Sequence, residues 1–120
     1  MAKILIVDDS PTETYKLTNI LERNDHSVLS AETGEQGVNL AKTEQPDVVL
    51  MDIVMPGLNG FQATRQLSKG SETKHIPVII VTAKNQQADQ VWGERQGARA
   101  YLVKPIDEKQ LVSAIADVLG

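Results

Sequence analysis

Three short runs of apolar residues contain no polar side chain, and they constrain the fold more than any other feature of the sequence. They are residues 4–7, 48–51 and 78–81. A strand with one face in water alternates apolar and polar residues, whereas a strand buried on both faces of a parallel sheet is apolar throughout. The runs therefore predict inner strands of a parallel sheet.

A fourth run, residues 101–103, and a weaker one, residues 28–30, complete a set of five predicted strands. The segments between them space their apolar residues as helices do, and the first such segment contains Tyr15, Leu17, Ile20 and Leu21. Five strands alternating with five helices predict an α/β fold with a doubly wound, five-stranded parallel sheet. The chain length of 120 residues predicts one domain, residues 1–120.

Capping residues indicate where the predicted helices begin and end. Three helix starts are typical of capping boxes, at Ser10, Thr33 and Asp107. The residues that we expect to end helices in the left-handed conformation are Asn24, Gly70 and Gly97. We also expect Trp92, in the predicted fourth helix, to pack against the protein rather than contact a partner. His26 and His75 are expected at the surface.

Composition excludes several classes of function. The formal net charge is −4, and there is no cysteine. An acidic chain lacks the basic surplus that neutralises phosphates, so no nucleic-acid partner is expected. Without cysteine there is no disulfide scaffold, thiolate zinc site or cysteine nucleophile. No apolar run approaches the roughly 20 residues that span a bilayer, and a cytoplasmic domain without membrane insertion is expected.

Polar residues follow the predicted strands. Asp8 and Asp9 follow the first, Asp52 the third, Thr82 the fourth and Lys104, before Pro105, the fifth. In doubly wound folds, ligands bind outside the carboxyl ends of the strands. We therefore expect these side chains to converge on one edge of the sheet.

Two or three carboxylates in one partly desolvated pocket repel one another unless a cation lies between them. Asp8 or Asp9 could instead cap the first helix, but Ser10 already occupies the capping position. A small set of carboxylates is typical of Mg²⁺ sites, which retain several waters. A carboxylate such as Asp52 can attack phosphorus when positive charge surrounds the transferring group, and Mg²⁺ and Lys104 would supply that charge.

These residues resemble the pattern of response-regulator receiver domains over essentially the whole chain. More narrowly, residues 49–67 and 91–93 resemble the single-domain receivers of bacterial type IV pilus chemosensory systems. The resemblance implies a flavodoxin-like (βα)5 fold of the CheY type with strand order 2-1-3-4-5. It also implies a two-component phosphoprotein in twitching motility signalling rather than a metabolic enzyme. The alternative within the same family is another chemotaxis-type receiver that is not linked to pili.

The resemblance also implies a role for each site residue. Asp52 would be the phosphoacceptor, and Lys104 and Thr82 would contact the phosphoryl group. Tyr101 would turn from exposed to buried as Thr82 moves. The only cofactor would be Mg²⁺, and its ligands would be Asp8, Asp9, Asp52 and the backbone carbonyl of Val54.

The implied partners are a chemotaxis-type histidine kinase and an unidentified downstream protein, with the domain itself a monomer. The downstream protein would contact the fourth helix, fifth strand and fifth helix, through residues 87–96, Tyr101 and 109–112. Alternatively, the domain would drain phosphate from a shared kinase, which uses the same chemistry.

Two other classes of protein share parts of this pattern. Phosphatases with an aspartate nucleophile need a second acid two residues later, where this chain has Val54, which cannot transfer a proton. Flavin-binding electron carriers need a phosphate-cradling loop after the first strand, and Asp8 and Asp9 would repel that phosphate.

Overall fold

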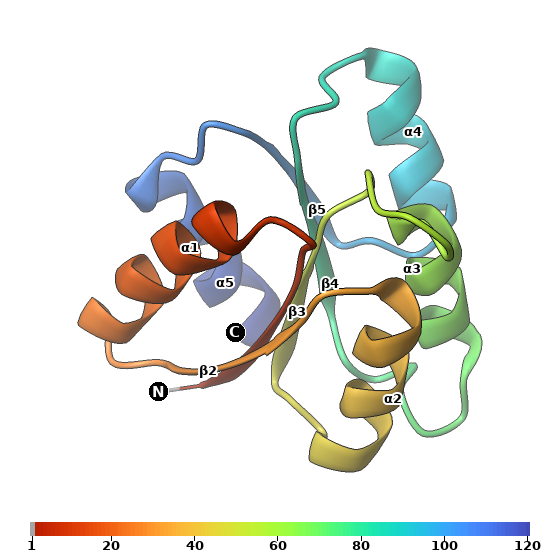
Figure 1. The fold of residues 1–120 in the computed structure, drawn as a ribbon, viewed down its shortest axis with the longest axis horizontal. Coiled ribbons are helices and arrows are strands. Elements are labelled where there is room, and N and C mark those ends of the chain that lie inside the picture. The colour runs from red at the N-terminus through yellow and green to blue at the C-terminus, as the bar shows by residue number, and fades with distance from the viewer. Residues whose placement is uncertain (1) are drawn as a thin grey trace.

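The computed structural model describes residues 2–120 and contains one five-stranded parallel sheet in the order β2-β1-β3-β4-β5. The strands are β1 (Lys3–Val7), β2 (Ser27–Ala31), β3 (Val48–Met51), β4 (Val78–Thr82) and β5 (Ala100–Val103). The helices are α1 (Pro11–Arg23), α2 (Gly34–Glu44), α3 (Gly60–Lys69), α4 (Gln87–Arg95) and α5 (Glu108–Leu119). The predicted doubly wound α/β fold and its strand order are confirmed (Figure 1).

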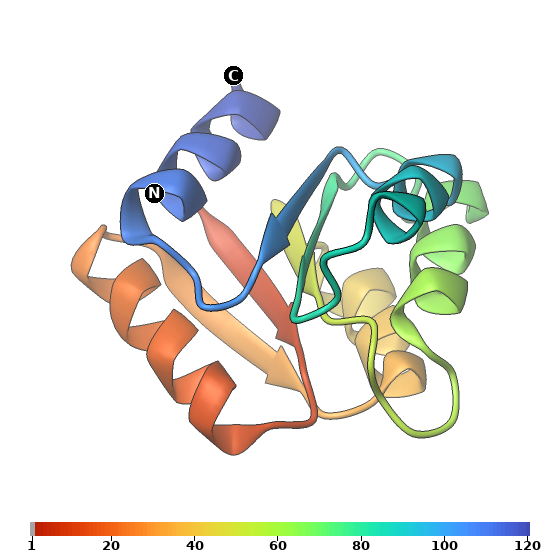
Figure 2. The same ribbon diagram turned by 90° about the horizontal axis from the view of Figure 1, so that it is seen from above.

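Helices cover both faces of the sheet (Figure 2). Helices α1 and α5 lie on one face, and α2, α3 and α4 lie on the other. Within β1, Ile4 and Ile6 pack in the layer of α1 and α5, whereas Leu5 and Val7 pack in the layer of α2 and α3. Because successive side chains of a strand point to opposite faces, both parities must be apolar here. This explains the uninterrupted apolar runs of the inner strands.

The predicted helix starts are confirmed by side-chain caps, but among the described helices the two-way capping box is at Asn59 and Gln62 of α3 rather than at these three starts. Ser10 Oγ accepts a hydrogen bond from the Glu13 backbone N–H at 3.3 Å, and Pro11 occupies the first helical turn. Thr33 and Asp107 cap α2 and α5 in the same way. These caps satisfy backbone donors that have no partner within the helix.

Two of the predicted left-handed helix ends are wrong. Asn24 has φ −104° and Gly70 has φ −71°, whereas Gly97 has the expected positive φ, at 108°. The left-handed residues after α1 and at the end of α2 are Asp25 and Gln45. Asn24 stays outside the left-handed region while its side-chain amide donates to the carbonyl oxygen of Ile20, which ends the helix locally.

The carboxyl ends of β1, β3, β4 and β5 lie at the same edge of the sheet because the strands are parallel. The backbone N–H of Asp52 donates to the Val7 carbonyl at 2.9 Å, which aligns the ends of β1 and β3. The Lys104–Pro105 peptide bond is cis. Within residues 2–120, no helix has the length and apolar character needed to cross a bilayer.

Candidate functional site

Three carboxylates meet where β1 and β3 end. One oxygen from each of Asp8, Asp9 and Asp52 lies within 4.8 Å of the others. Asp8 is 3% exposed and Asp52 7%, whereas Asp9 is exposed. Buried carboxylates need compensating partners, because burial disfavours their charge. The negative charge of this cluster must therefore be compensated by nearby cations.

Lys104 supplies one of these cations from the loop after β5. Its Nζ lies 2.8 Å from Asp8 Oδ2, 3.2 Å from Asp52 Oδ2 and 3.9 Å from Glu13 Oε1. Burial disfavours the charged ammonium, but the hydrogen bond to Asp8 and the charge of Asp52 outweigh it and raise the pKa of Lys104. Lys104 therefore remains a cation between the two buried carboxylates.

The two buried carboxylates are held by different groups. Asp8 Oδ1 accepts the backbone N–H of Ser10 at 2.9 Å. Burial raises the pKa of Asp8, against the lowering effect of the hydrogen bonds from Lys104 and Ser10. Asp52 Oδ1 accepts the backbone N–H of Ile53 at 2.7 Å, which leaves Oδ2 facing Lys104. Backbone and ammonium together fix the orientation of the Asp52 carboxylate.

Gly60, the first residue of α3, allows this helix to approach Asp52. A Cβ at position 60 would lie 2.0 Å from the backbone oxygen of Asp52 and 2.6 Å from the Cα of Ile53. Both neighbours are backbone atoms that cannot rotate away. Position 60 must therefore be glycine for α3 to start this close to Asp52.

The donor set fits a hard divalent cation. The cluster has three carboxylates, and within the part of the chain that the structure describes Lys104 is the one ammonium paired with them, through Asp8 and Asp52, so negative charge is in excess. All of the candidate ligand atoms are oxygens, which Mg²⁺ prefers, and exposed Asp9 leaves the cluster accessible to solvent. The acidic edge of the sheet is suited to hold Mg²⁺.

Thr82 and Tyr101 lie beyond the carboxylates. Thr82 ends β4 and is fully buried, and its Oγ1 lies 3.5 Å from the backbone nitrogen of Lys84. The Tyr101 hydroxyl donates to the Lys84 carbonyl at 2.8 Å. Burial, and next the negative charges of Asp89 and Asp52, raise the pKa of Tyr101 to about 12. The loop after β4 thus lies between these two residues.

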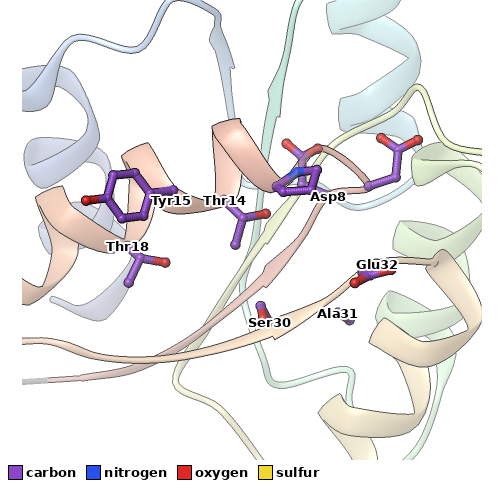
Figure 3. Close-up of a pocket in the computed structure, with 9 residues that line it drawn as sticks. Asp8, Thr14, Tyr15, Thr18, Ser30, Ala31 and Glu32 are labelled. Carbon is purple, nitrogen blue, oxygen red and sulfur yellow. The ribbon is translucent and has the colours of Figure 1, made fainter.

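A pocket of about 330 Å³ opens beside the carboxylates, between α1 and the end of β2 (Figure 3). Its lining residues are Asp8, Asp9, Pro11, Thr14, Tyr15, Thr18, Ser30, Ala31 and Glu32. Tyr15 lies in α1, as its helical spacing indicates, and its side chain is exposed beside this pocket. Sequence reasoning missed this pocket because its hydroxyl residues are ordinary for a helix surface and a strand end.

The other single-residue predictions have mixed outcomes. Trp92 does not pack into the protein but is 49% exposed on α4, so that prediction is wrong. The Val54 side chain is also exposed, and its backbone N–H lies 3.4 Å from Asp52 Oδ1. His26 accepts the backbone N–H of Ala2, and exposed His75 pairs with Gln45, so neither belongs to the acidic site.

Comparisons with known proteins agree with this geometry. Residues 4–116 match the family described as the response regulator receiver domain. The chain is 69% identical to Protein PilH of Pseudomonas aeruginosa over 120 residues, which are 100% of this chain and 99% of that protein.

Two solved structures show the same fold. The chemotaxis protein CheY4 of Vibrio cholerae matches with a TM-score of 0.91 at 28% identity, over 99% of both chains. The receiver domain of the sensor histidine kinase PA1611 of Pseudomonas aeruginosa also has a TM-score of 0.91 at 28% identity, over 99% of this chain and 98% of that one. That structure has a magnesium ion coordinated in its active-site cleft.

Proposed function

Because the chain belongs to the response regulator receiver domain family, we propose that its Asp52 accepts a phosphoryl group from a histidine kinase. One observation carries this assignment. The carboxylate of Asp52 is buried at a strand end, with Oδ1 held by backbone N–H groups and Oδ2 3.2 Å from the Lys104 ammonium. A carboxylate oriented beside a fixed positive charge is suited to attack a phosphoryl group.

In the proposed step, an oxygen of Asp52 forms a bond to the phosphorus of a phosphohistidine. The bond from phosphorus to the histidine nitrogen breaks, and that nitrogen keeps the electron pair and takes up a proton. The product is an acyl phosphate on Asp52 and a free histidine on the kinase. Lys104 stabilises the negative charge on the phosphoryl oxygens, and buried Thr82 donates a hydroxyl hydrogen bond to them.

We assign Mg²⁺ to Asp8, Asp9, Asp52 and the backbone carbonyl of Val54. The excess of carboxylates over ammonium at this site supports the assignment. When bound, Mg²⁺ would neutralise charge on the transferring phosphoryl group.

The proposed reaction changes the surface of the receiver domain and does not turn over a substrate. A dianionic phosphoryl group recruits Thr82 and Lys104, and Tyr101 turns inward as Thr82 moves. The altered surface of α4, β5 and α5, including residues 87–96 and 109–112, then binds an unidentified downstream protein. We propose that the chain acts as a single cytoplasmic receiver domain, residues 1–120, and as a monomer.

The pathway assigned to the chain is type IV pilus signalling, with a chemotaxis-type histidine kinase as the phosphodonor. Its support is the 69% identity to Protein PilH across the full length of both proteins. Signalling to a downstream protein and draining phosphate from a shared kinase use the same chemistry at Asp52. A phosphate sink needs no downstream partner, so the two roles differ in whether the phosphorylated protein binds one.

Intact mass spectrometry tests the proposed acceptor. In one experiment the protein is incubated with Mg²⁺ and acetyl phosphate. In a second experiment it is incubated with Mg²⁺, a chemotaxis-type kinase and ATP. We expect one phosphoryl adduct, which is absent in Asp52→Ala and in the presence of a chelator. Asp107→Ala, at an exposed helix cap, is the matched carboxylate control and keeps the adduct. A folded wild-type protein without an adduct from either donor would refute the proposal.

A further inference from the structure

Helix α4 packs on the sheet with little buried side-chain surface of its own. Gly93 is the only buried residue of this helix, and Val91 and Trp92 beside it are exposed. Within residues 2–120, neither of the two apolar core layers includes a residue of α4. The helix is therefore held by very little buried side-chain surface, which makes its position easy to shift.

The backbone of α4 rests directly on two side chains at Gly93. A Cβ at position 93 would lie 2.7 Å from Ile80 Cδ1 and 3.3 Å from Tyr101 Cδ2. Ile80 is fully buried in β4, so its methyl group has little space to move, whereas the Tyr101 ring is only half-buried. An added Cβ would therefore push α4 and the Tyr101 ring apart.

Tyr101 also holds the beginning of the same helix. Its hydroxyl donates to the carbonyl of Lys84, in the loop that leads into α4. Gln86, the residue at the N-cap, makes no side-chain capping hydrogen bond. One tyrosine thus contacts α4 at Gly93 through its ring and holds the entrance to α4 through its hydroxyl.

We propose that Gly93 is a positioning residue that couples the Tyr101 ring to helix α4. Because no side chain separates the helix backbone from the ring, a displacement of the ring displaces the helix and its exposed surface at Val91 and Trp92. This explains a glycine inside a helix, where it costs about 1 kcal/mol relative to alanine. The proposed use of the coupling, to report phosphorylation of Asp52, rests on the proposed function above.

Trp92 provides the measurement, since it is the only tryptophan of the chain and adjoins Gly93. Its fluorescence is recorded before and after treatment with Mg²⁺ and acetyl phosphate, and intact mass gives the phosphorylated fraction. In Gly93→Ala we expect an unchanged adduct but an emission change per adduct of about half the wild-type value or less. An undiminished emission change with the same adduct would overturn the proposal.

Two further variants separate coupling from helix propensity. Gln90→Ala raises helix propensity at an exposed position of α4 and is expected to keep the full emission change. Ile80→Val removes the Cδ1 methyl that the new Cβ would meet, so we expect Gly93→Ala with Ile80→Val to recover part of the emission change. Loss of the signal in Gln90→Ala, or no recovery in the double variant, would contradict the contact at Gly93.

The coupling can also be measured without phosphate, which distinguishes its failure from failure of the proposed function. Amide hydrogen exchange of α4 is compared in Tyr101→Phe, which keeps the ring but lacks the hydroxyl, and in Tyr101→Ala, each with and without Gly93→Ala. We expect the step from Tyr101→Phe to Tyr101→Ala, which removes the ring alone, to speed exchange in α4 much less when Gly93 is already replaced, because the ring acts through its contact at Gly93. Additive effects would overturn the coupling, whether or not the wild type is phosphorylated.

Discussion

Replacing Lys104 with methionine keeps most of the length of the side chain and removes the charge between two buried carboxylates. The ammonium lies 2.8 Å from Asp8 Oδ2 and 3.2 Å from Asp52 Oδ2, and the Lys104 side chain is 13% exposed. At an effective dielectric constant of about 20, these two attractions amount to ~6 and ~5 kcal/mol before desolvation. Lys104→Met leaves both carboxylates without this partner.

The net loss is smaller than the sum of these attractions, because methionine needs no desolvation of a charge. Removing one partner of a buried ion pair costs about 3–5 kcal/mol, and we expect a loss at the lower end because the site borders solvent. A loss of about 3 kcal/mol in a domain of this size lowers the melting temperature by roughly 10 °C. The expected loss applies at neutral pH without divalent cations.

Urea unfolding followed by circular dichroism measures the loss, in chelator and again with Mg²⁺. Because Lys104→Met increases the excess of negative charge at the acidic site, we expect Mg²⁺ to stabilise this variant more than the wild type. Lys109→Met, at an exposed position of α5, is the matched control and should change the free energy of unfolding very little. Equal losses in the two variants, or equal stabilisation of wild type and Lys104→Met by Mg²⁺, would refute the reasoning.

Three further predictions concern single contacts. Gly60→Ala forces α3 away from the backbone of Asp52. We therefore expect the free energy of unfolding in urea to fall by about 2 kcal/mol and the phosphoryl adduct to form more slowly. An unchanged rate of adduct formation would contradict this prediction. In Tyr15→Phe, which leaves Tyr101 as the only tyrosine, ultraviolet titration should give a pKa of about 12. Because this pKa is raised in the folded state, the stability linked to it is complete below pH 10 and is lost as the pH rises through 12. Ionisation of Tyr101 near pH 10 in the folded protein would refute this prediction. Ser10→Ala removes the cap of α1 and should cost about 1 kcal/mol in urea unfolding, whereas Ser10→Thr should cost less.

The convergence of the acidic site was predictable because it follows from sheet geometry alone. Once residues 4–7 and 48–51 are assigned to parallel strands, the residues that follow them must meet at one edge. The structure brings Asp8, Asp9 and Asp52 together there, with Lys104 between the buried pair. Local apolar patterns and strand direction are sufficient for this part of the prediction.

The exposure of Trp92 was not predictable in the same way. Helical spacing indicates that some face of α4 meets the sheet, but the face is set by which residue allows close approach. That residue is Gly93, which has no side chain and can therefore lie close to Ile80 and Tyr101. A glycine adds nothing to an apolar pattern, so the pattern favours its large neighbours instead.

The end of α1 was missed because it depends on a contact distant in sequence. Asn24 donates through its side chain to the Ile20 carbonyl and also to Glu108 Oε2, a residue of α5. Held in this way, Asn24 does not adopt the left-handed conformation, and Asp25 adopts it instead, at φ 68°. Propensity identifies a short polar residue at this turn, but only the tertiary partner decides which one takes the positive φ.

The alternation of side chains along the inner strands limits which sequence changes this chain can tolerate. The sheet separates the layer of α1 and α5 from the layer of α2 and α3, so distant substitutions in the two layers should combine additively. A one-residue insertion in β1 or β3 is different, because it would exchange the two faces of the strand and turn the carboxylate that follows it. Side-chain identity can therefore drift separately in each layer, while the residue count of these strands must stay fixed.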